Sequence, residues 1–224
     1  MDVAYFFNRR LEFIRQLYDT ASSPYLERKR KIEAEEVPFA LPYSEDGEPA
    51  FLEEWIEADE SLHVLAYSCV SMLAGALHLY LETWVSESHV RIDEALKKTF
   101  KKIGWFPGYK THYFQRFAIN FEACQENLRL LEEVVLARNR IEHPSSITSI
   151  RINYDDANLR KLPHPFFIDE REAALFADAE EDERAWFIPP TLHVTEKQLL
   201  AAITVAEGFA KWFDAEIESR IYAQ

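Results

Sequence analysis

The stretch LEEWIEADESLHVLAYSCVSMLAGALHLYLETWV, residues 52–85, decides the fold class of this chain. Its apolar residues recur at steps of three, four and seven, so one face of an α-helix stays apolar from end to end. That face comprises Leu52, Ile56, His63, Ala66, Val70, Leu73, Leu77, Tyr80 and Trp84. A helix of about 36 residues would be about 54 Å long, a length that is typical of helical bundles.

Both ends of the chain are also predicted to be long helices. Residues 2–20 carry an apolar stripe at helical spacing. A loop is expected to follow, because the sequence SSP at 22–24 and a run of mixed charges do not favour a continuous helix. The last helix is expected to begin at Thr195, whose spacing to Gln198 forms a capping box, and to end near Tyr222.

Two further helices are expected between these. Residues 92–103 form a short helix that ends at Gly104, where a left-handed backbone is easily adopted. The turn WFPGY then leads into a fourth long helix, residues 113–142, which Pro144 ends. This segment has two apolar stripes about 100–120° apart on a helical wheel, which indicates a helix in the middle of a bundle.

Residues 144–194 have a mixed pattern and are predicted to be a small insertion before the last helix. The sequence SITSIRINY at 146–154 alternates enough for a short strand, and PHPFF at 163–167 and AWFIPP at 185–190 are candidates for others. Residues 169–184 are an acidic run. A structureless loop of this length would be unusual, so we expect the insertion to have its own irregular, β-containing structure.

Composition is that of one globular domain, residues 1–224. Apolar residues make up 48% and charged residues 29%, and glycine is scarce at 5, which favours packed helices over a turn-rich β fold. The net charge of −14 argues against a general nucleic-acid coating protein. It does not argue against an enzyme acting on RNA, because local charge is what holds a phosphate.

The sequence predicts a cytoplasmic protein without a membrane span. The start MDVAYFFNRR lacks the basic and apolar regions of a signal peptide, and Glu82 interrupts the most apolar stretch. Cys69 and Cys124 lie in helical patterns, with neither metal spacing nor a disulfide framework. His78 and Glu82 lie one helical turn apart, but no Glu-x-x-His pair exists on a facing helix. No metal or cofactor is therefore predicted.

One hexapeptide suggests chemistry: Arg138-Asn139-Arg140-Ile141-Glu142-His143, at the end of the fourth long helix. Arg138, Asn139 and His143 resemble the R-x4-6-H signature of the HEPN superfamily, helical-bundle proteins of which many are metal-independent ribonucleases. The chain has no other Arg-x4-His pair. The resemblance implies an all-α, antiparallel HEPN-like bundle of four long helices plus a short helix, interrupted by the 144–194 insertion.

The resemblance also implies roles for the three residues. His143 is the candidate acid/base, because imidazole titrates near neutrality. Arg138 presents a planar fork of donors to phosphate oxygens, and Asn139 orients the imidazole or the substrate. The expected activity is endoribonuclease cleavage of RNA to a 2′,3′-cyclic phosphate and a 5′-OH. Arg138 and His143 lie about 140° apart on an ideal helix, so the helix end must unwind or a second copy must contribute.

A second reading of the motif stays open. Arg138 can pair with Glu142 one turn on, His143 suits the negative end of the helix dipole, and Asn139 can be solvated. The chain would then be a non-catalytic HEPN-like binding or interaction module that dimerises or docks a partner. The expected partners are RNA, a second copy of the chain, and an antitoxin or other defence protein, since the resemblance suggests toxin–antitoxin or antiphage defence.

A basic face is the candidate RNA track. Four lysines recur on one face of the short helix, and two more basic residues follow among aromatic ones, which together comprise Lys97, Lys98, Lys101, Lys102, Lys110 and Arg116. Basic side chains with interleaved aromatic rings can hold a single strand through phosphate contacts and base stacking. The alternative is a solvated lysine face that covers aromatic residues of the core.

Overall fold

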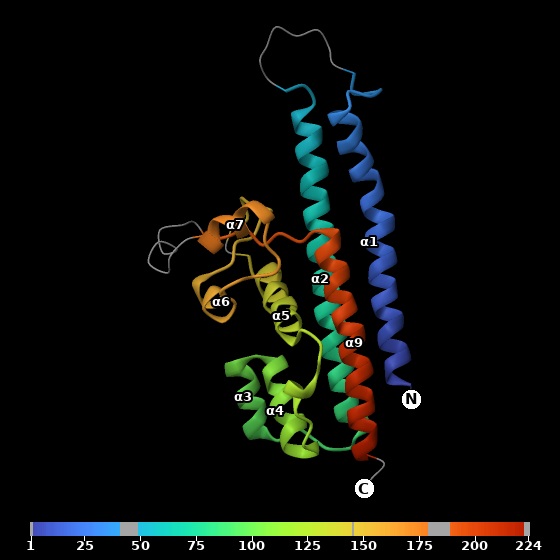
Figure 1. Cartoon of the computed structure of the whole chain (residues 1–224), viewed down its shortest axis with the longest axis vertical. Coiled ribbons are helices and arrows are strands. Elements are labelled where there is room, and N and C mark those ends of the chain that lie inside the picture. The colour runs from blue at the N-terminus through green and yellow to red at the C-terminus, as the bar shows by residue number, and fades with distance from the viewer. Residues whose placement is uncertain (1, 41–48, 145, 179–188, 222–224) are drawn as a thin grey trace.

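The computed structural model describes residues 2–40, 49–144, 146–178 and 189–221, and these residues form helices and loops without a strand (Figure 1). The prediction of an all-α fold is therefore confirmed. Within the described ranges nine elements follow one another: α1 (Val3–Glu33), α2 (Leu52–Glu87), α3 (Glu94–Ile103), α4 (Trp105–Phe117), the 3-10 helix η1 (Phe121–Ala123), α5 (Leu128–Glu142), α6 (Asp156–Lys161), α7 (Glu170–Asp178) and α9 (Glu196–Ile221).

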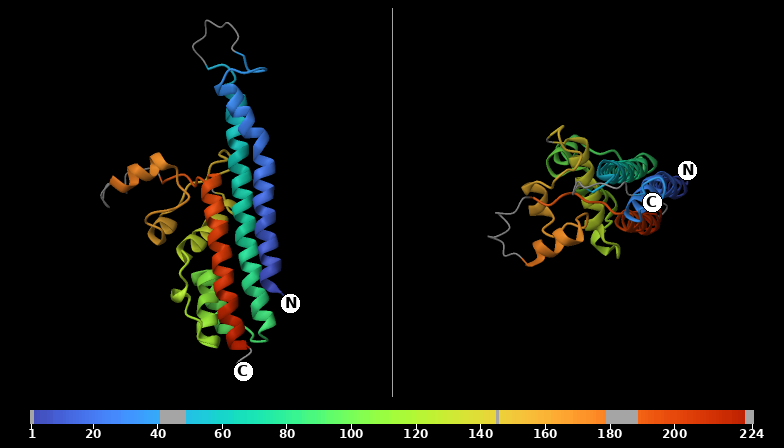
Figure 2. Two further views of the ribbon diagram at one scale, coloured as in Figure 1. Left: turned by 45° about the vertical axis from the view of Figure 1, so that its right-hand side comes forward. Right: turned by 90° about the horizontal axis from the view of Figure 1, so that it is seen from above.

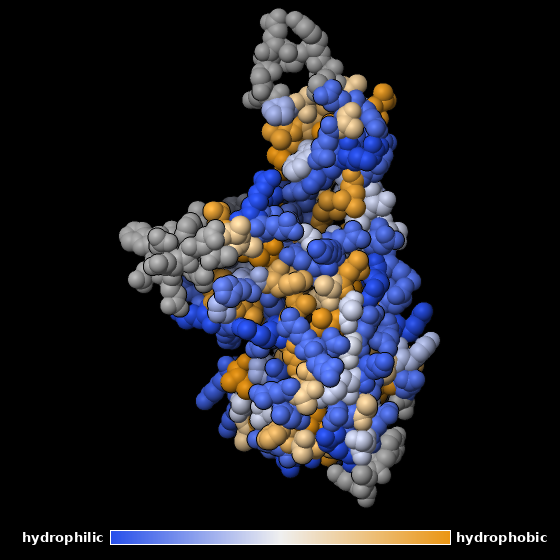
Figure 3. Space-filling view, viewed as in Figure 1, coloured by the Kyte–Doolittle hydropathy of each residue, from blue (hydrophilic) through white to orange (hydrophobic). Residues whose placement is uncertain are grey.

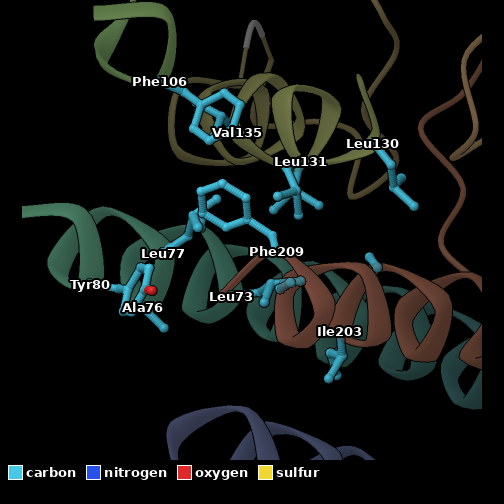
Figure 4. Close-up of a cluster of buried hydrophobic side chains, with 14 of the residues drawn as sticks. Leu73, Ala76, Leu77, Tyr80, Phe106, Leu130, Leu131, Val135, Ile203 and Phe209 are labelled. Carbon is cyan, nitrogen blue, oxygen red and sulfur yellow. The ribbon is translucent and has the colours of Figure 1, made fainter. Parts of the chain in front are cut away.

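The core lies where α2, α4, α5 and α9 meet, and α2 contributes most of its length to it. The apolar face predicted for residues 52–85 is buried from Ala58 to Trp84. Figure 4 shows Leu73 and Leu77 of α2 facing Leu131 and Val135 of α5, with Phe209 of α9 between the helices. All of these side chains are buried, so this cluster sets the positions of the three helices.

The first helix is longer than predicted. It continues through Pro24 to Glu33, where the sequence predicted a loop after residue 20. Proline removes one backbone donor, but the second half of α1 is held against α2, because Lys29 Nζ lies 2.6 Å from Asp59 Oδ1. Arg30 and Lys31 also pair with Glu27 about one turn earlier, and Arg30 pairs with Glu36 just beyond the end of the helix. The charges that were read as a loop signal therefore stabilise a helix.

The fourth long helix was predicted wrongly. Residues 113–142 are split between α4 and α5, with η1 between them. Ala118 adopts a left-handed backbone, with φ of 52°, and ends α4. The side chains of Asn120 and Asn127 then accept hydrogen bonds from the first turns of η1 and α5. Asparagine is a favoured residue at both positions, so each cap starts a new element and the segment is divided instead of forming one helix.

The other helix predictions are confirmed within a residue or two. The short helix α3 ends before Gly104, whose φ is 94°. The capping box of α9 is present, with Gln198 N donating to Thr195 Oγ1 at 3.2 Å and Thr195 N donating to Gln198 Oε1 at 2.9 Å. The helix runs to Ile221, and Tyr222, its predicted end, lies outside the described residues.

The insertion contains the short helices α6 and α7 but no strand among its described residues. Residues 146–154 and 191 meet in one isolated antiparallel bridge, between Asn153 and Thr191, and residues 163–167 form a loop. The predicted strand at 185–190 and the second half of the acidic run lie largely outside the described residues. An isolated bridge forms no ladder, so the predicted alternation of residues 146–154 did not produce a sheet.

The long helices α1, α2 and α9 run side by side, and α1 and α2 extend beyond α9 at one end (Figures 1 and 2). On the face that carries α9, hydrophilic side chains predominate, with apolar residues exposed towards the extended end of the α1–α2 pair (Figure 3). Leu26 near the C-terminal end of α1 and Leu52 and Ile56 at the start of α2 are exposed.

Among the described residues, one helix is long and apolar enough by length and composition to cross a membrane. This helix is α2, and 56% of its most apolar 18-residue window is buried inside the protein. A core helix of a bundle passes the same test, because it is apolar where it packs against its neighbours.

Candidate functional site

The Arg-Asn-x-x-x-His motif lies where α5 leaves the core. The first turns of α5 bury residues such as Leu131 and Val134 against α2 and α9. Beyond Ala137 the exposure rises sharply: Arg138 is half-buried, whereas Asn139 and His143 are exposed. The helix thus presents its last turn to solvent while its first turns hold it rigidly in the bundle.

Arg138 has partners inside the motif. Its NH2 lies 2.5 Å from Glu142 Oε2, and its NH1 donates to Asn139 Oδ1 at 3.2 Å. The side chains of Arg138 and Glu142 are 36% and 37% exposed. An ion pair at such exposure contributes at most about 1 kcal/mol, so an arriving phosphate can replace Glu142. This is also the pairing that the non-catalytic reading predicts.

His143 is the C-terminal cap of α5 and lies outside the helix. Its φ of −127° and ψ of 64° turn the chain away before Pro144. The 140° separation from Arg138 expected on an ideal helix therefore does not apply to it. No hydrogen bond or ion pair joins His143 to Arg138 or Asn139 within the described residues, and the Asn139 side chain accepts a hydrogen bond from Arg138.

A groove of about 590 Å³ runs beside the motif, between α2 and residues 141–152. Its walls are apolar or carry hydroxyl groups, and Glu142 is the charged residue among those that line it. Arg138, Asn139 and His143 do not line this groove. It can receive an apolar or neutral group next to the motif, but it contains no cation for a phosphate.

The charge of Arg138 influences the pKa of a histidine on α2, His78. Burial lowers the pKa of His78, nearby Glu82 opposes this, and the Arg138 charge lowers the pKa further. The His78 ring meets the rings of Trp105 and Tyr109, with centroids 4.8 and 5.7 Å away. His78 is therefore a neutral, aromatic-packed side chain near Arg138, and the His78–Glu82 pair considered as metal ligands has no further ligand beside it.

No group of three or more His, Cys, Asp or Glu side chains in the described ranges is arranged to hold a metal ion. A cluster of ionisable side chains lies around Asp59, which pairs with Lys29 at 2.6 Å and with Arg151 at 2.8 Å. His63 approaches Asp59 at 3.5 Å and faces the ring of His193 at 5.0 Å. The two cations neutralise Asp59 and join α1, α2 and the insertion.

Sequence reasoning missed Glu133, a buried carboxylate on α5 that is 3% exposed. It accepts hydrogen bonds from the Tyr154 hydroxyl at 2.8 Å and from the backbone N–H groups of Phe166 and Phe167. Burial raises the pKa of Glu133, and these donors oppose the rise. The signal was its place among apolar residues of the buried stripe, between Leu130 and Ala137. Glu133 ties the insertion to the helix that carries the motif.

The predicted RNA track divides into an exposed part and a buried part. Four of its lysines are exposed on α3, namely Lys97, Lys98, Lys101 and Lys102. Lys97 pairs with Glu94 at 2.6 Å, and Arg116 pairs with Asp93 at 3.4 Å. Lys110 lies 5.1 Å from the centroid of the Phe106 ring.

The aromatic residues of the same segment mostly point inward. Phe106, Tyr109 and Tyr113 are buried in the core, whereas Phe114 is exposed. Stacking with successive bases needs exposed ring faces, and most of these rings do not offer them. In Figure 1, α3 lies beside α4, and α5 leads away from both towards α6 and α7. The lysines and the motif thus belong to different elements.

Comparison with known proteins leaves the family open. No family model matches the chain, and neither a curated protein nor a solved structure matches it. The likeness to the HEPN superfamily therefore rests on Arg138, Asn139 and His143 and on the helical bundle that carries them.

Proposed function

We propose that this protein is a metal-independent endoribonuclease of the HEPN type that acts as a homodimer in the cytoplasm. The observation that carries the proposal is the placement of the motif: Arg138, Asn139 and His143 lie at the solvent-exposed end of a helix whose other turns are buried. Exposure gives RNA access, and the buried turns fix where the side chains lie, which is what positioned catalysis requires.

The reaction is transfer of a phosphodiester to the neighbouring ribose hydroxyl. His143 takes the proton of the 2′-OH, the 2′ oxygen attacks phosphorus, and the bond to the 5′ oxygen breaks. Arg138 neutralises the negative charge that develops on the phosphoryl oxygens, as a fixed guanidinium does without reorganisation. The leaving 5′ oxygen receives a proton from the second copy's histidine. The products are a 2′,3′-cyclic phosphate and a 5′-OH.

A second copy would complete the site. Within one chain Arg138 pairs with Glu142, and no hydrogen bond or ion pair among the described residues joins it to His143. Two motif ends facing each other would provide a base and an acid, together with two arginines for one phosphate. The resemblance places such proteins in toxin–antitoxin or antiphage defence, so an antitoxin or another defence protein is the expected regulator.

The test is cleavage of a mixed RNA pool in EDTA, with end-group analysis of the products. The wild type should leave cyclic phosphate ends, and His143→Ala should cleave at least about 100-fold more slowly with its helix content unchanged. His164→Ala is the matched control, because His164 is also an exposed histidine. Equal cleavage by wild type and His143→Ala would remove His143 from the reaction and point to another site.

The second candidate function is a non-catalytic binding or interaction module, which the Arg138–Glu142 pair favours. In that case neither the wild type nor His143→Ala would cleave RNA at any enzyme concentration. RNA binding also distinguishes the two functions, because a module that docks only a protein partner would show no salt-dependent binding of RNA.

RNA binding is tested separately through the lysines of α3. Replacing Lys97, Lys98, Lys101 and Lys102 with alanine should weaken binding of single-stranded RNA. The slope of log affinity against log salt should fall by about 0.7 for each phosphate contact that is lost. Replacing the exposed Lys197 and Lys211 of α9 is the matched control. An unchanged slope in the α3 variant would show that these lysines are only a solvated surface.

A further inference from the structure

The face of α1 and α2 that points away from α9 is apolar and uncovered by any described helix. In the view from above in Figure 2, α9 lies on one side of the α1–α2 pair and no other helix lies on the opposite side. Phe6 and Phe13 of α1 are 56% and 57% exposed there, and Val64, Met72 and Leu79 of α2 are also exposed. An open groove of about 770 Å³ lies between Phe6 and Phe13 on one side and Met72 and Leu79 on the other, whereas Val64 lies beyond its end. Contiguous apolar surface of this kind marks an interaction site.

The middle of this face is shaped for close contact with another helix. Small residues recur every seven positions along the exposed side of α2, at Ser61, Ser68 and Gly75. A Cβ built on Gly75 would meet nothing within 4 Å, so none of the described chain covers that position. Small residues let two backbones approach, while the larger Val64 and Met72 beside them supply apolar contact.

The two ends of the face carry opposite charge. Arg9 and Arg10 are exposed near the end that holds Leu79, and neither forms an ion pair with a described residue. Glu53 and Glu54 lie at the other end, where α2 begins, whereas Glu57, one turn further on, pairs with Arg28 of the same chain at 3.7 Å. A second copy in antiparallel orientation would bring the arginines of one chain to the glutamates of the other. A parallel copy would bring like charges together, which is unfavourable.

The same antiparallel arrangement matches the side chains in the middle. With the two-fold axis at Ser68, Val64 of one chain meets Met72 of the other, since each lies four residues from Ser68. Ser61 meets Gly75 in the same way, since each lies seven residues away. From Glu57 to Leu79 the face is about 33 Å long and two helices wide, which gives about 650 Å² per chain, close to that of a standard interface.

We propose that this face of α1 and α2 is a homodimer interface in which two α2 helices pack antiparallel about Ser68. The inference rests on the proposed function only in expecting a second copy. It also deepens that function, because Ser68 and Ser71 line the groove beside Glu142 and Pro144, so the two-fold axis would pass near the motif ends of both chains.

The first test compares two substitutions at Gly75 by sedimentation velocity on the full chain. The wild type should dimerise, and Gly75→Ala should dimerise as well. Gly75→Lys should weaken dimerisation at least about tenfold, because two unpaired charges would be buried at the contact. Both side chains point into open space in the monomer, so helix content by circular dichroism should be unchanged. A monomeric wild type, or equal association of both variants, would overturn the proposal.

The second test fixes the orientation with cysteines, in a Cys124→Ser background that leaves only the buried Cys69. Mixed Val64→Cys and Met72→Cys proteins should form a disulfide-linked heterodimer on mild oxidation. Each protein alone should not, because eight residues separate the positions by about 12 Å, beyond the reach of a disulfide. Efficient self-linking of Val64→Cys would mean parallel pairing and would reject the antiparallel register.

Controls separate this proposal from the ribonuclease proposal. Thr204→Cys places an exposed cysteine on α9, away from the face, and should give no covalent dimer. Linking of Thr204→Cys as efficient as that of the Val64→Cys and Met72→Cys mixture would indicate random collision and overturn the interface. A dimer with the expected links but without RNA cleavage would support the interface and reject the catalytic function. RNA cleavage by a monomeric protein would support the catalytic function and reject the interface.

Discussion

The two halves of α5 carry the same kinds of residue but differ in what surrounds them. Glu133, in the first half, is buried and accepts hydrogen bonds from Tyr154, Phe166 and Phe167. Glu142, in the last turn, is 37% exposed and pairs with Arg138 alone among the described residues. One carboxylate holds the insertion in place, and the other is free to exchange its partner for a ligand. Burial rather than residue type thus separates a carboxylate that holds the fold together from one that lies in an exposed ion pair on the same helix.

The largest expected change in stability follows removal of the buried carboxylate of Glu133. Glu133→Ala would leave a buried hydroxyl and two backbone N–H groups without an acceptor, so unfolding free energy should fall by about 3–5 kcal/mol. Denaturant unfolding followed by circular dichroism measures this change. Glu132→Ala, one position along the same helix and only half-buried, is the control and should change stability by less than about 0.5 kcal/mol. A similar fall in unfolding free energy in both variants would mean that the hydrogen bonds to Glu133 do not account for the loss of stability.

A smaller effect is expected at a buried histidine, in contrast to the exposed His143. Neither ring nitrogen of His112 has a partner among the described residues, and its side chain is fully buried. His112→Phe should therefore raise the unfolding free energy by about 1 kcal/mol near neutral pH. His143→Phe should leave it unchanged within about 0.5 kcal/mol.

The buried His112 should also contribute to the pH dependence of stability. Burial lowers the pKa of His112, with Arg116 adding to the effect and Asp93 opposing it. The unfolded chain then binds a proton that the folded chain rejects, so this share of stability is present above about pH 6.5 and is lost as pH falls towards the folded pKa. Thermal unfolding across mildly acidic pH should be less pH-dependent in His112→Phe than in the wild type. An equally steep fall would assign the proton uptake to another group, such as His63, whose pKa burial also lowers.

The start of α5 provides the next comparison. Asn127 caps the helix by accepting from Leu130 N at 3.3 Å, so Asn127→Ala should cost about 1 kcal/mol. Asn139→Ala, on the exposed turn of the same helix, should cost less than about 0.5 kcal/mol. Equilibrium unfolding of the two variants side by side checks the difference. Equal losses would show that the amide of Asn139 also supports the helix end.

The smallest effect is expected for the ion pair of the motif. Arg138→Ala, Glu142→Ala and the double variant should yield a coupling energy below about 1 kcal/mol, because the pair is exposed and i,i+4. The coupling should fall further as salt increases. A coupling of several kcal/mol would mean that the last turn is as fixed as the first, which would remove the contrast between the two halves of α5.

Local sequence rules correctly predicted the helices whose position is set by apolar periodicity and by capping residues within the segment itself. The 3.6-residue period of residues 52–85, the capping box at Thr195 and the glycine after α3 are readable without tertiary contacts, and the structure confirms each. The same rules failed for residues 113–142, where the periodicity of two short helices mimicked one long helix. The caps at Asn120 and Asn127 were visible in the sequence, but apolar periodicity outweighed them.

For the candidate site, the sequence by itself determined the residues, namely Arg138, Asn139 and His143 at the end of a helix before Pro144. It also determined the all-α class, because residue spacing along the chain is what sets a helical face. Only the tertiary structure decided the exposure of the motif, the burial of Glu133 and the continuation of α1 through Pro24. These three depend on segments that are distant in sequence, and contacts of that kind outweigh local preferences of about 1 kcal/mol per residue.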